Sequence, residues 1–99
     1  MFMNEDDFEW DKEKAAENDR KHGIGFEVAR YVFDDPAAVD ELDDREHYGE
    51  DRFNVTGIVG GRVLVVTYTI RSRTRLISAR LAAPHERKRY HEKNRESHS

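Results

Sequence analysis

Two segments in the second half of the chain alternate between apolar and polar residues and are rich in β-branched side chains. They span 52–59 and 62–70, and Gly60-Gly61 separates them. A period of two predicts strands, and a two-glycine connection favours a primed hairpin turn. That turn sets the register, in which Val59 pairs with Arg62. The pattern therefore predicts an antiparallel hairpin.

The predicted register divides the hairpin into an apolar and a polar face. A third strand, 75–81, follows the turn Ser72-Arg73 and extends both faces if Arg71 pairs with Thr74. A slip of one residue would exchange the faces and bury three arginines, so the pattern opposes slippage. The apolar face then carries Phe53, Val55, Gly57, Leu64, Val66, Tyr68, Ile77, Ala79 and Leu81. The polar face carries Glu50, Arg52, Asn54, Thr67, Thr69, Arg71, Ser78 and Arg80.

The first residues of the chain predict a short strand followed by a helix. Residues 8–10 alternate like a short edge strand. Asp11 is a suitable N-cap for a helix over 12–22, and Gly23 is a natural left-handed stop.

Two further helices complete the predicted architecture. Apolar residues after Gly25 have helical spacing until the chain reaches Pro36. Residues 37–49 are acidic with little periodicity, which indicates a loop. Pro84 opens a final, mostly solvated helix. The order β-α-α-β-β-β-α predicts an α+β fold, in which the first two helices cover the apolar face of an antiparallel sheet and leave the polar face open.

The composition limits the classes of protein that fit. With 99 residues, the chain is expected to form a single domain over 1–99, with 96–99 as a disordered tail. Cysteine is absent, which excludes disulfides and thiolate chemistry. The acidic N-terminal segment does not resemble a signal peptide, and the longest apolar stretch, Val63–Val66, is too short to span a bilayer. A cytoplasmic protein without membrane contact is expected.

The net charge of −4 conceals a segregation of the two signs. Residues 1–50 contain 17 acidic and 6 basic residues, whereas residues 51–99 contain 4 acidic and 11 basic residues. The split indicates a basic face that suits a polyanion, although the two halves could also attract each other within the fold.

Arg52, Arg71 and Arg80 are the candidate phosphate ligands of the polar face. A guanidinium donates two parallel hydrogen bonds to phosphate and stays charged. The alternative is that these arginines only protect the sheet from edge pairing. The predicted register also separates Arg71 from Arg80 by ~20 Å along the strand, so that one phosphate cannot bind both.

Glu50 and His22 are the candidate acid–base groups. Glu50, opposite Arg71, is either a cross-strand ion pair or a proton acceptor beside a phosphate-binding cation. His22 at a helix C-terminus either complements the helix dipole or supplies a charged imidazolium as a general acid. No histidine pair has metal spacing with an acidic partner, so no metal and no other cofactor are expected. Cleavage of RNA requires no metal ion, because the 2′-OH of the RNA is an internal nucleophile.

The order and spacing of many short segments resemble the BrnT family of toxins over nearly the whole chain. In the first half these segments are Phe8-Glu9-Trp10-Asp11, Lys14-Ala15, Asn18, Lys21-His22-Gly23, Phe26-Glu27 and Val32-Phe33-Asp34-Asp35-Pro36. In the second half they are Gly49-Glu50-Asp51-Arg52, Gly57, Gly61-Arg62-Val63-Leu64, Val66, Tyr68-Thr69, Ile77-Ser78-Ala79-Arg80, Glu86-Arg87 and Tyr90.

The resemblance implies a RelE-like fold and a metal-independent ribonuclease that inhibits translation and growth. It also implies neutralisation by a BrnA-type ribbon-helix-helix antitoxin, with two toxins held by an antitoxin dimer that alone contacts operator DNA. The expected catalytic residues are His22, Glu50, Arg71 and Arg80, and the expected RNA-binding residues are Lys21, Arg52, Arg73 and Arg89.

Two other functions fit the same residues. A basic sheet could bind RNA or an acidic protein segment without cleaving anything, or the domain could serve only as a structural partner. Cleavage of labelled RNA in the presence of a chelator separates a metal-free nuclease from a binder.

Overall fold

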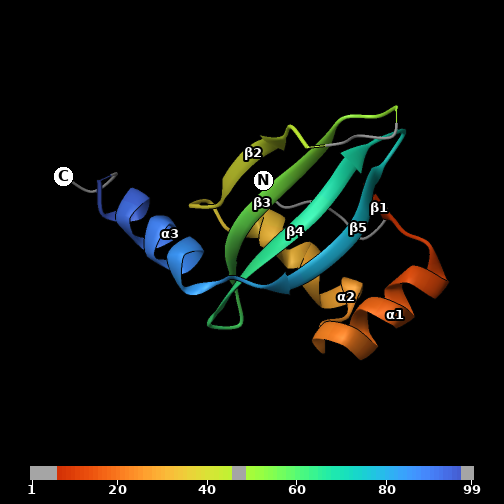
Figure 1. Ribbon diagram of the computed structural model, residues 1–99, viewed down its shortest axis with the longest axis horizontal. Helices are drawn as coiled ribbons and strands as arrows, with labels where there is room; N and C mark the ends of the chain where they lie inside the picture. Colours follow the sequence, from red (N-terminus) through yellow and green to blue (C-terminus); the bar gives the residue numbers. More distant parts are fainter. Residues whose placement is uncertain (1–6, 46–48, 97–99) are drawn as a thin grey trace.

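A five-stranded mixed sheet organises the chain (Figure 1), and the computed structural model describes residues 7–45 and 49–96. Its strands lie in the order β1-β5-β4-β3-β2, with β1 parallel to β5 and the other pairs antiparallel. The predicted α+β class is confirmed, and the arrangement agrees with the RelE-like class. The elements are β1 (Phe8–Glu9), α1 (Lys12–His22), α2 (Phe26–Ala29), a 3-10 helix (Arg30–Asp34), β2 (Val39–Asp43), β3 (Arg52–Val59), β4 (Arg62–Ile70), β5 (Thr74–Leu81) and α3 (Pro84–Glu96).

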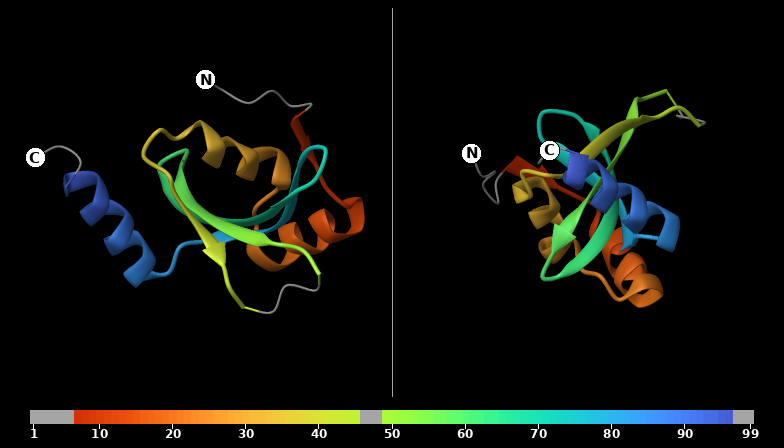
Figure 2. Two further views of the ribbon diagram at one scale, coloured as in Figure 1. Left: turned by 90° about the horizontal axis from the view of Figure 1, so that it is seen from above. Right: turned by 90° about the vertical axis from the view of Figure 1, so that its left-hand side faces the viewer.

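The main core lies between one face of the sheet and the segment formed by α2 and the 3-10 helix (Figure 2). α1 lies beside β5 at the edge of the sheet, and α3 extends from the opposite end of the molecule. None of the helices within 7–45 and 49–96 is long and apolar enough to cross a membrane. The buried core residues are Phe8, Ile24, Phe26, Ala29, Val32, Val55, Leu64, Val66, Tyr68, Leu76 and Ala79.

The local signals at the helix ends act as the sequence predicts. The Oδ1 atom of Asp11 accepts hydrogen bonds from the backbone N–H groups of Glu13 (2.8 Å) and Lys14 (3.1 Å). Gly23 ends α1 with a φ of 70° and donates its N–H to the carbonyl oxygen of Asp19. These bonds satisfy backbone groups that a helix end leaves unpaired.

The central hairpin also has its predicted register. Gly60 and Gly61 have φ angles of 57° and 82°, the left-handed values that a primed turn requires. Val59 pairs with Arg62, and the pairing continues to the other end of both strands.

The expectation of a loop throughout 37–49 was wrong, because β2 pairs with β3 at the edge of the sheet. Asp40 of this strand accepts the hydroxyl hydrogen bond of Tyr68, and Asp43 binds Arg45 at 2.8 Å. Acidic side chains suit an edge strand because they oppose pairing with a second sheet. The same side chains conceal the apolar–polar alternation that would identify β2 as a strand.

The predicted register of β4 with β5 was wrong at one end. It holds from Leu64 to Thr67, but a β-bulge then pairs Tyr68 with Leu76 instead of Ile77. The extra residue turns Leu76 into the core, where it is 2% exposed, and places Arg75 opposite Thr69 on the polar face.

The face predicted to be open and polar is polar over only part of its length. At the hairpin end, Val63 and Val65 form a second apolar cluster with Ala82 and Tyr90. Tyr90 packs there at 5% exposure and donates its hydroxyl to Asp35 Oδ2 at 2.6 Å. α3 continues to Glu96, and residues 97–99 of the expected tail lie outside the described residues.

Candidate functional site

Two neighbouring depressions lie between α1 and β5, and the smaller one extends to the start of β3. We call them together the α1–β5 groove. One has a volume of about 100 Å³ and the other about 260 Å³, and Lys14 and Ile77 line both. The smaller is lined by Asp11, Lys14, Glu50, Arg52, Arg71, Arg75, Leu76 and Ile77. The larger is lined by Lys14, Glu17, Asn18, Lys21, His22, Ile77 and Ser78.

Asn18 holds α1 in the position that forms this groove. β1 pairs with only the first two residues of β5, so the outer edge of β5 is free beyond them. The side-chain amide of Asn18 accepts from the N–H of Ala79 (3.1 Å) and donates to its carbonyl oxygen (2.9 Å). Asn18 also donates to the carbonyl oxygen of Ile24 at 3.1 Å. The buried amide thus satisfies the backbone groups of Ala79 that a neighbouring strand would otherwise bind. It also holds α1 so that the turns on either side of Asn18 line the groove.

Two arginines share one carboxylate in the smaller depression. Glu50 Oε1 lies 3.1 Å from Nη2 of Arg71, and its Oε2 lies 3.5 Å from Nε of Arg52. The hydrogen bond from Arg71 is the main cause that lowers the pKa of Glu50, and partial burial opposes it. Glu50 is therefore an anion at neutral pH, and the pair that it forms with Arg71 is the predicted cross-strand ion pair. Two guanidinium groups around one carboxylate leave an excess of positive charge.

The groove brings together five of the eight predicted site residues. Lys21 and His22 come from the last turn of α1. Arg52 is the first residue of β3, Glu50 lies two residues before it, and Arg71 directly follows β4. His22 and Glu50 line neighbouring depressions rather than the same one.

The other three predicted residues lie elsewhere. Arg80 pairs with Val65, and its guanidinium binds both oxygens of Glu86, at 2.7 and 2.9 Å. Arg89 is bound to Glu41. Arg73 lies exposed in the turn between β4 and β5. None of the three lines the groove, so the structure does not place Arg80 with the expected catalytic group.

Two groove residues were missed by the sequence prediction. Arg75 reaches the polar face only because of the β-bulge, and there its Nη1 atom binds Glu9 Oε2 at 2.9 Å. Lys14 was assigned no role, although Lys14, Asn18 and Lys21 lie at i, i+4 and i+7 on one face of a helix. From this spacing, the sequence could have indicated that Lys14 shares a helix face with Lys21.

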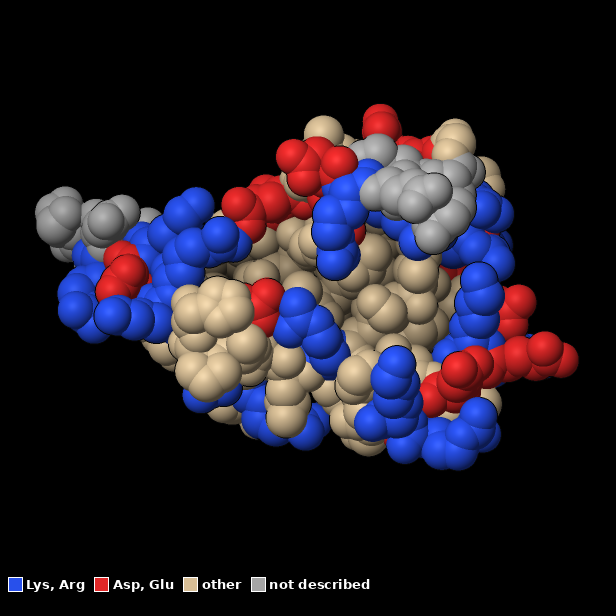
Figure 3. Space-filling model, in the orientation of Figure 1, with Lys and Arg blue, Asp and Glu red and all other residues tan. Residues whose placement is uncertain are grey.

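The charges of the groove favour an anionic ligand. Its lining contains five cationic side chains (Lys14, Lys21, Arg52, Arg71 and Arg75) and three acidic ones (Asp11, Glu17 and Glu50). On the face seen in Figure 3, lysine and arginine side chains lie around much of a central uncharged area, and acidic side chains lie along its upper edge and at the right. Within the described residues, no group of three or more His, Asp or Glu side chains is arranged to hold a metal ion. Fold and groove together define a small α+β domain with a cationic groove, whose charge is complementary to an anionic ligand.

Comparison with known families identifies the kind of protein to which this domain belongs. A family model described as ribonuclease toxin, BrnT, of type II toxin-antitoxin system matches residues 10–86. The match covers most of the chain, and the chain therefore belongs to the BrnT family of ribonuclease toxins. No curated protein matches the chain significantly. The family is the one that the sequence motifs indicated.

Proposed function

We propose that this toxin is a metal-independent endoribonuclease of the cytoplasm that cuts RNA by using the 2′-OH of the substrate as the nucleophile. The observation that carries the proposal is the α1–β5 groove, in which five cations, His22 and Glu50 line two adjoining depressions. This set provides phosphate binding and two groups able to exchange protons, which is what RNA cleavage without a metal requires.

The proposed reaction takes place where the two depressions meet, beside Lys14. The 2′-OH attacks the adjacent phosphorus and loses its proton to Glu50, while the bond from phosphorus to the 5′ oxygen breaks. His22 gives a proton to that departing oxygen, and a 2′,3′-cyclic phosphate remains on the other product. Arg71 and Lys14 stabilise the charge that develops on the phosphate oxygens.

The remaining cations would bind the RNA on either side of the cut. Arg52, Arg75 and Lys21 line the groove and would face the substrate backbone. Arg80, with a side chain that is 44% exposed, lies ~20 Å along the sheet from Arg71 and suits a flanking phosphate. Arg73 and Arg89 are exposed and would contact the backbone farther away.

A protein partner would control this activity. Membership of a type II toxin-antitoxin family implies an antitoxin. We further propose a BrnA-type ribbon-helix-helix antitoxin, whose dimer holds two toxin chains and alone contacts operator DNA. Free toxin would then inhibit translation and arrest growth.

Cleavage of a labelled single-stranded RNA in excess EDTA tests the nuclease mechanism. The expected products end in 2′,3′-cyclic phosphate, and a substrate with 2′-deoxyribose at the cut site stays intact there. Lys14→Ala should lose most of the activity. Lys12→Ala, on the same helix but outside the groove, should keep it. Cleavage that requires an added divalent metal would contradict the mechanism.

One observation favours the non-catalytic alternative. Glu50 is held by Arg71 with a lowered pKa, and a carboxylate with a low pKa is a weak proton acceptor. If the groove serves only to bind, RNA will be retained by the wild type and released by Lys14→Ala, without cleavage of either sample.

A further inference from the structure

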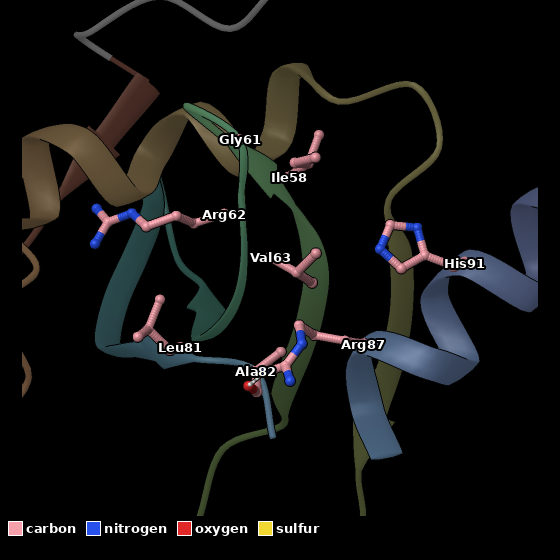
Figure 4. Close-up of a pocket in the computed structure, with 8 residues that line it drawn as sticks. All are labelled: Ile58, Gly61, Arg62, Val63, Leu81, Ala82, Arg87 and His91. Atoms are coloured by element: carbon pink, nitrogen blue, oxygen red, sulfur yellow. Dashed lines mark hydrogen bonds between the residues drawn. The ribbon is translucent and has the colours of Figure 1, made fainter. Parts of the chain in front are cut away.

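A second hollow lies at the other end of the sheet, between the tip of the β3–β4 hairpin and α3. Its volume is about 340 Å³, and it is lined by Ile58, Gly61, Arg62, Val63, Leu81, Ala82, Arg87 and His91. Figure 4 shows Val63 of the sheet facing Arg87 and His91 of α3 across this space. We call it the hairpin–α3 hollow. The proposed nuclease mechanism uses none of its residues.

The floor of the hollow is aliphatic and open to solvent. Ile58 is 40% exposed, and Val63 and Ala82 lie buried on the same face of the sheet. Leu81, which is 50% exposed, pairs with Leu64 and borders the hollow from the other face. An exposed apolar surface at a concavity marks an interaction site, whereas apolar side chains scattered singly over a surface do not. A pocket of this kind receives one anchoring side chain of a partner.

The rim of the hollow is basic. Arg62, Arg87 and His91 are exposed, and no acidic residue is among those that line the space. Arg87 Nη1 donates to the carbonyl oxygen of Ala82 at 3.0 Å, which fixes the direction of its guanidinium. A partner segment that carries carboxylates beside its apolar anchor is therefore complementary in both charge and shape.

The chemistry of the floor favours a protein segment over RNA. Unpaired bases bind by stacking on aromatic or guanidinium faces. The guanidinium groups of Arg62 and Arg87 and the ring of His91 belong to the rim, whereas the floor consists of aliphatic side chains and contains no aromatic ring. An aliphatic floor selects a leucine-like or phenylalanine-like anchor.

The hollow is separate from the α1–β5 groove. Ser78 is the residue of β5 nearest to the hollow among those that line the groove, Leu81 lines the hollow, and three residues of strand span ~10 Å. A partner docked in the hollow therefore leaves the groove open unless another part of it extends along the sheet.

We propose that the hairpin–α3 hollow is the anchoring site for an acidic, amphipathic segment of the antitoxin. This inference rests on the proposed neutralisation by an antitoxin. It adds that attachment of the antitoxin and inhibition of RNA cleavage are separable, because the anchoring site lies outside the nuclease groove.

The test measures the affinity of the cognate antitoxin for purified toxin variants by isothermal titration calorimetry. Ile58→Asp introduces a charge into the floor and should weaken binding about tenfold or more. Its control is Val28→Asp, because Val28 is also a β-branched aliphatic residue with 40% exposure, but lies on α2. Arg87→Glu should weaken binding and reduce its dependence on salt, whereas Lys88→Glu, the next residue on α3, should bind nearly as the wild type does.

RNA cleavage by the same samples separates this inference from the nuclease proposal. Ile58→Asp is expected to cleave RNA at the wild-type rate while escaping neutralisation. If Ile58→Asp and Arg87→Glu bind antitoxin as tightly as their controls, the anchoring site lies elsewhere and the inference is overturned, with the nuclease proposal intact. Loss of RNA binding by Ile58→Asp would also overturn it, because the hollow would then belong to the RNA site. Wild-type toxin without cleavage activity would instead contradict the nuclease proposal alone.

Discussion

The two ends of the open sheet face use arginine differently. At the groove end, Arg52 and Arg71 share the single carboxylate of Glu50, so positive charge remains in excess. At the hairpin end, the guanidinium of Arg80 binds both oxygens of Glu86. Glu86 Oε1 also accepts from the N–H of Ala83, which ties the ion pair to the start of α3. The same residue type therefore leaves unneutralised positive charge at one end and forms an internal connection at the other. The two ends differ in the number of arginines that bind each carboxylate, which is two at the groove end and one at the hairpin end.

Removal of Arg71 should have the largest effect on activity. Arg71→Ala is expected to reduce the single-turnover rate of RNA cleavage by about 10²–10³-fold, because a cation that stabilises the developing charge is lost. The side chain is half exposed, so the melting temperature should stay close to that of the wild type. Arg20→Ala, an exposed change on α1 outside the groove, is the control. A folded Arg71→Ala protein with normal cleavage would show that the groove end has no catalytic role.

The next effect should come from His22. His22→Gln keeps a polar side chain of similar size but cannot donate a proton to the leaving oxygen, and about 10²-fold of the rate should be lost. Single-turnover cleavage of the same labelled RNA by the wild type and the variant decides the matter. A variant that cleaves at the wild-type rate would exclude His22 as the acid.

Asn18 should affect stability and thereby the groove. Asn18→Ala leaves the N–H and carbonyl of Ala79 without their partner at a buried edge, at a cost of about 2 kcal/mol in the free energy of unfolding. α1 should then detach from β5, and RNA binding should weaken although every cation remains. Urea unfolding gives the first quantity and fluorescence anisotropy the second. Asn94→Ala, which removes a hydrogen bond within α3, should change neither quantity appreciably.

The smallest effect is expected at the hairpin end. The hydrogen bond from Arg80 is the main cause that lowers the pKa of Glu86 from 4.5 to about 2. Because the folded-state pKa lies below the unfolded one, the pair stabilises the protein above pH 4.5 and the contribution is lost as the pH falls towards 2. Arg80 is 44% exposed, so the contribution is about 1 kcal/mol or less.

Glu86→Gln should therefore lower stability slightly at pH 7 and flatten the decline of stability between pH 4.5 and 2. Cleavage at neutral pH should remain within about twofold of the wild type. Thermal unfolding across this pH range measures the first effect. A strong loss of cleavage by this variant would contradict the placement of Arg80 outside the catalytic group.

Local signals were sufficient wherever neighbouring residues decide the outcome. The cap at Asp11, the stop at Gly23 and the Gly60-Gly61 turn each act within a few residues, and all three were predicted correctly. The hairpin register followed from the turn and from the alternation of its two strands, since a slip would bury charges. The acidic edge strand β2 was missed because its alternation is concealed by charge.

Only the tertiary structure decided which cations form a site. The β-bulge after Thr67 exchanges the faces of Leu76 and Arg75, and it arises from packing Leu76 into the core across the sheet. The position of α1 depends on hydrogen bonds between Asn18 and Ala79, 61 residues apart in the chain.

The sequence by itself determined the fold class, the family and the supply of cations on the polar face. It could not assign Arg80 to Glu86 or Arg89 to Glu41, because both pairs depend on where α3 lies against the sheet. The charge of a side chain is a property of the residue, but the electric potential at a site depends on the distances between residues that the fold brings together.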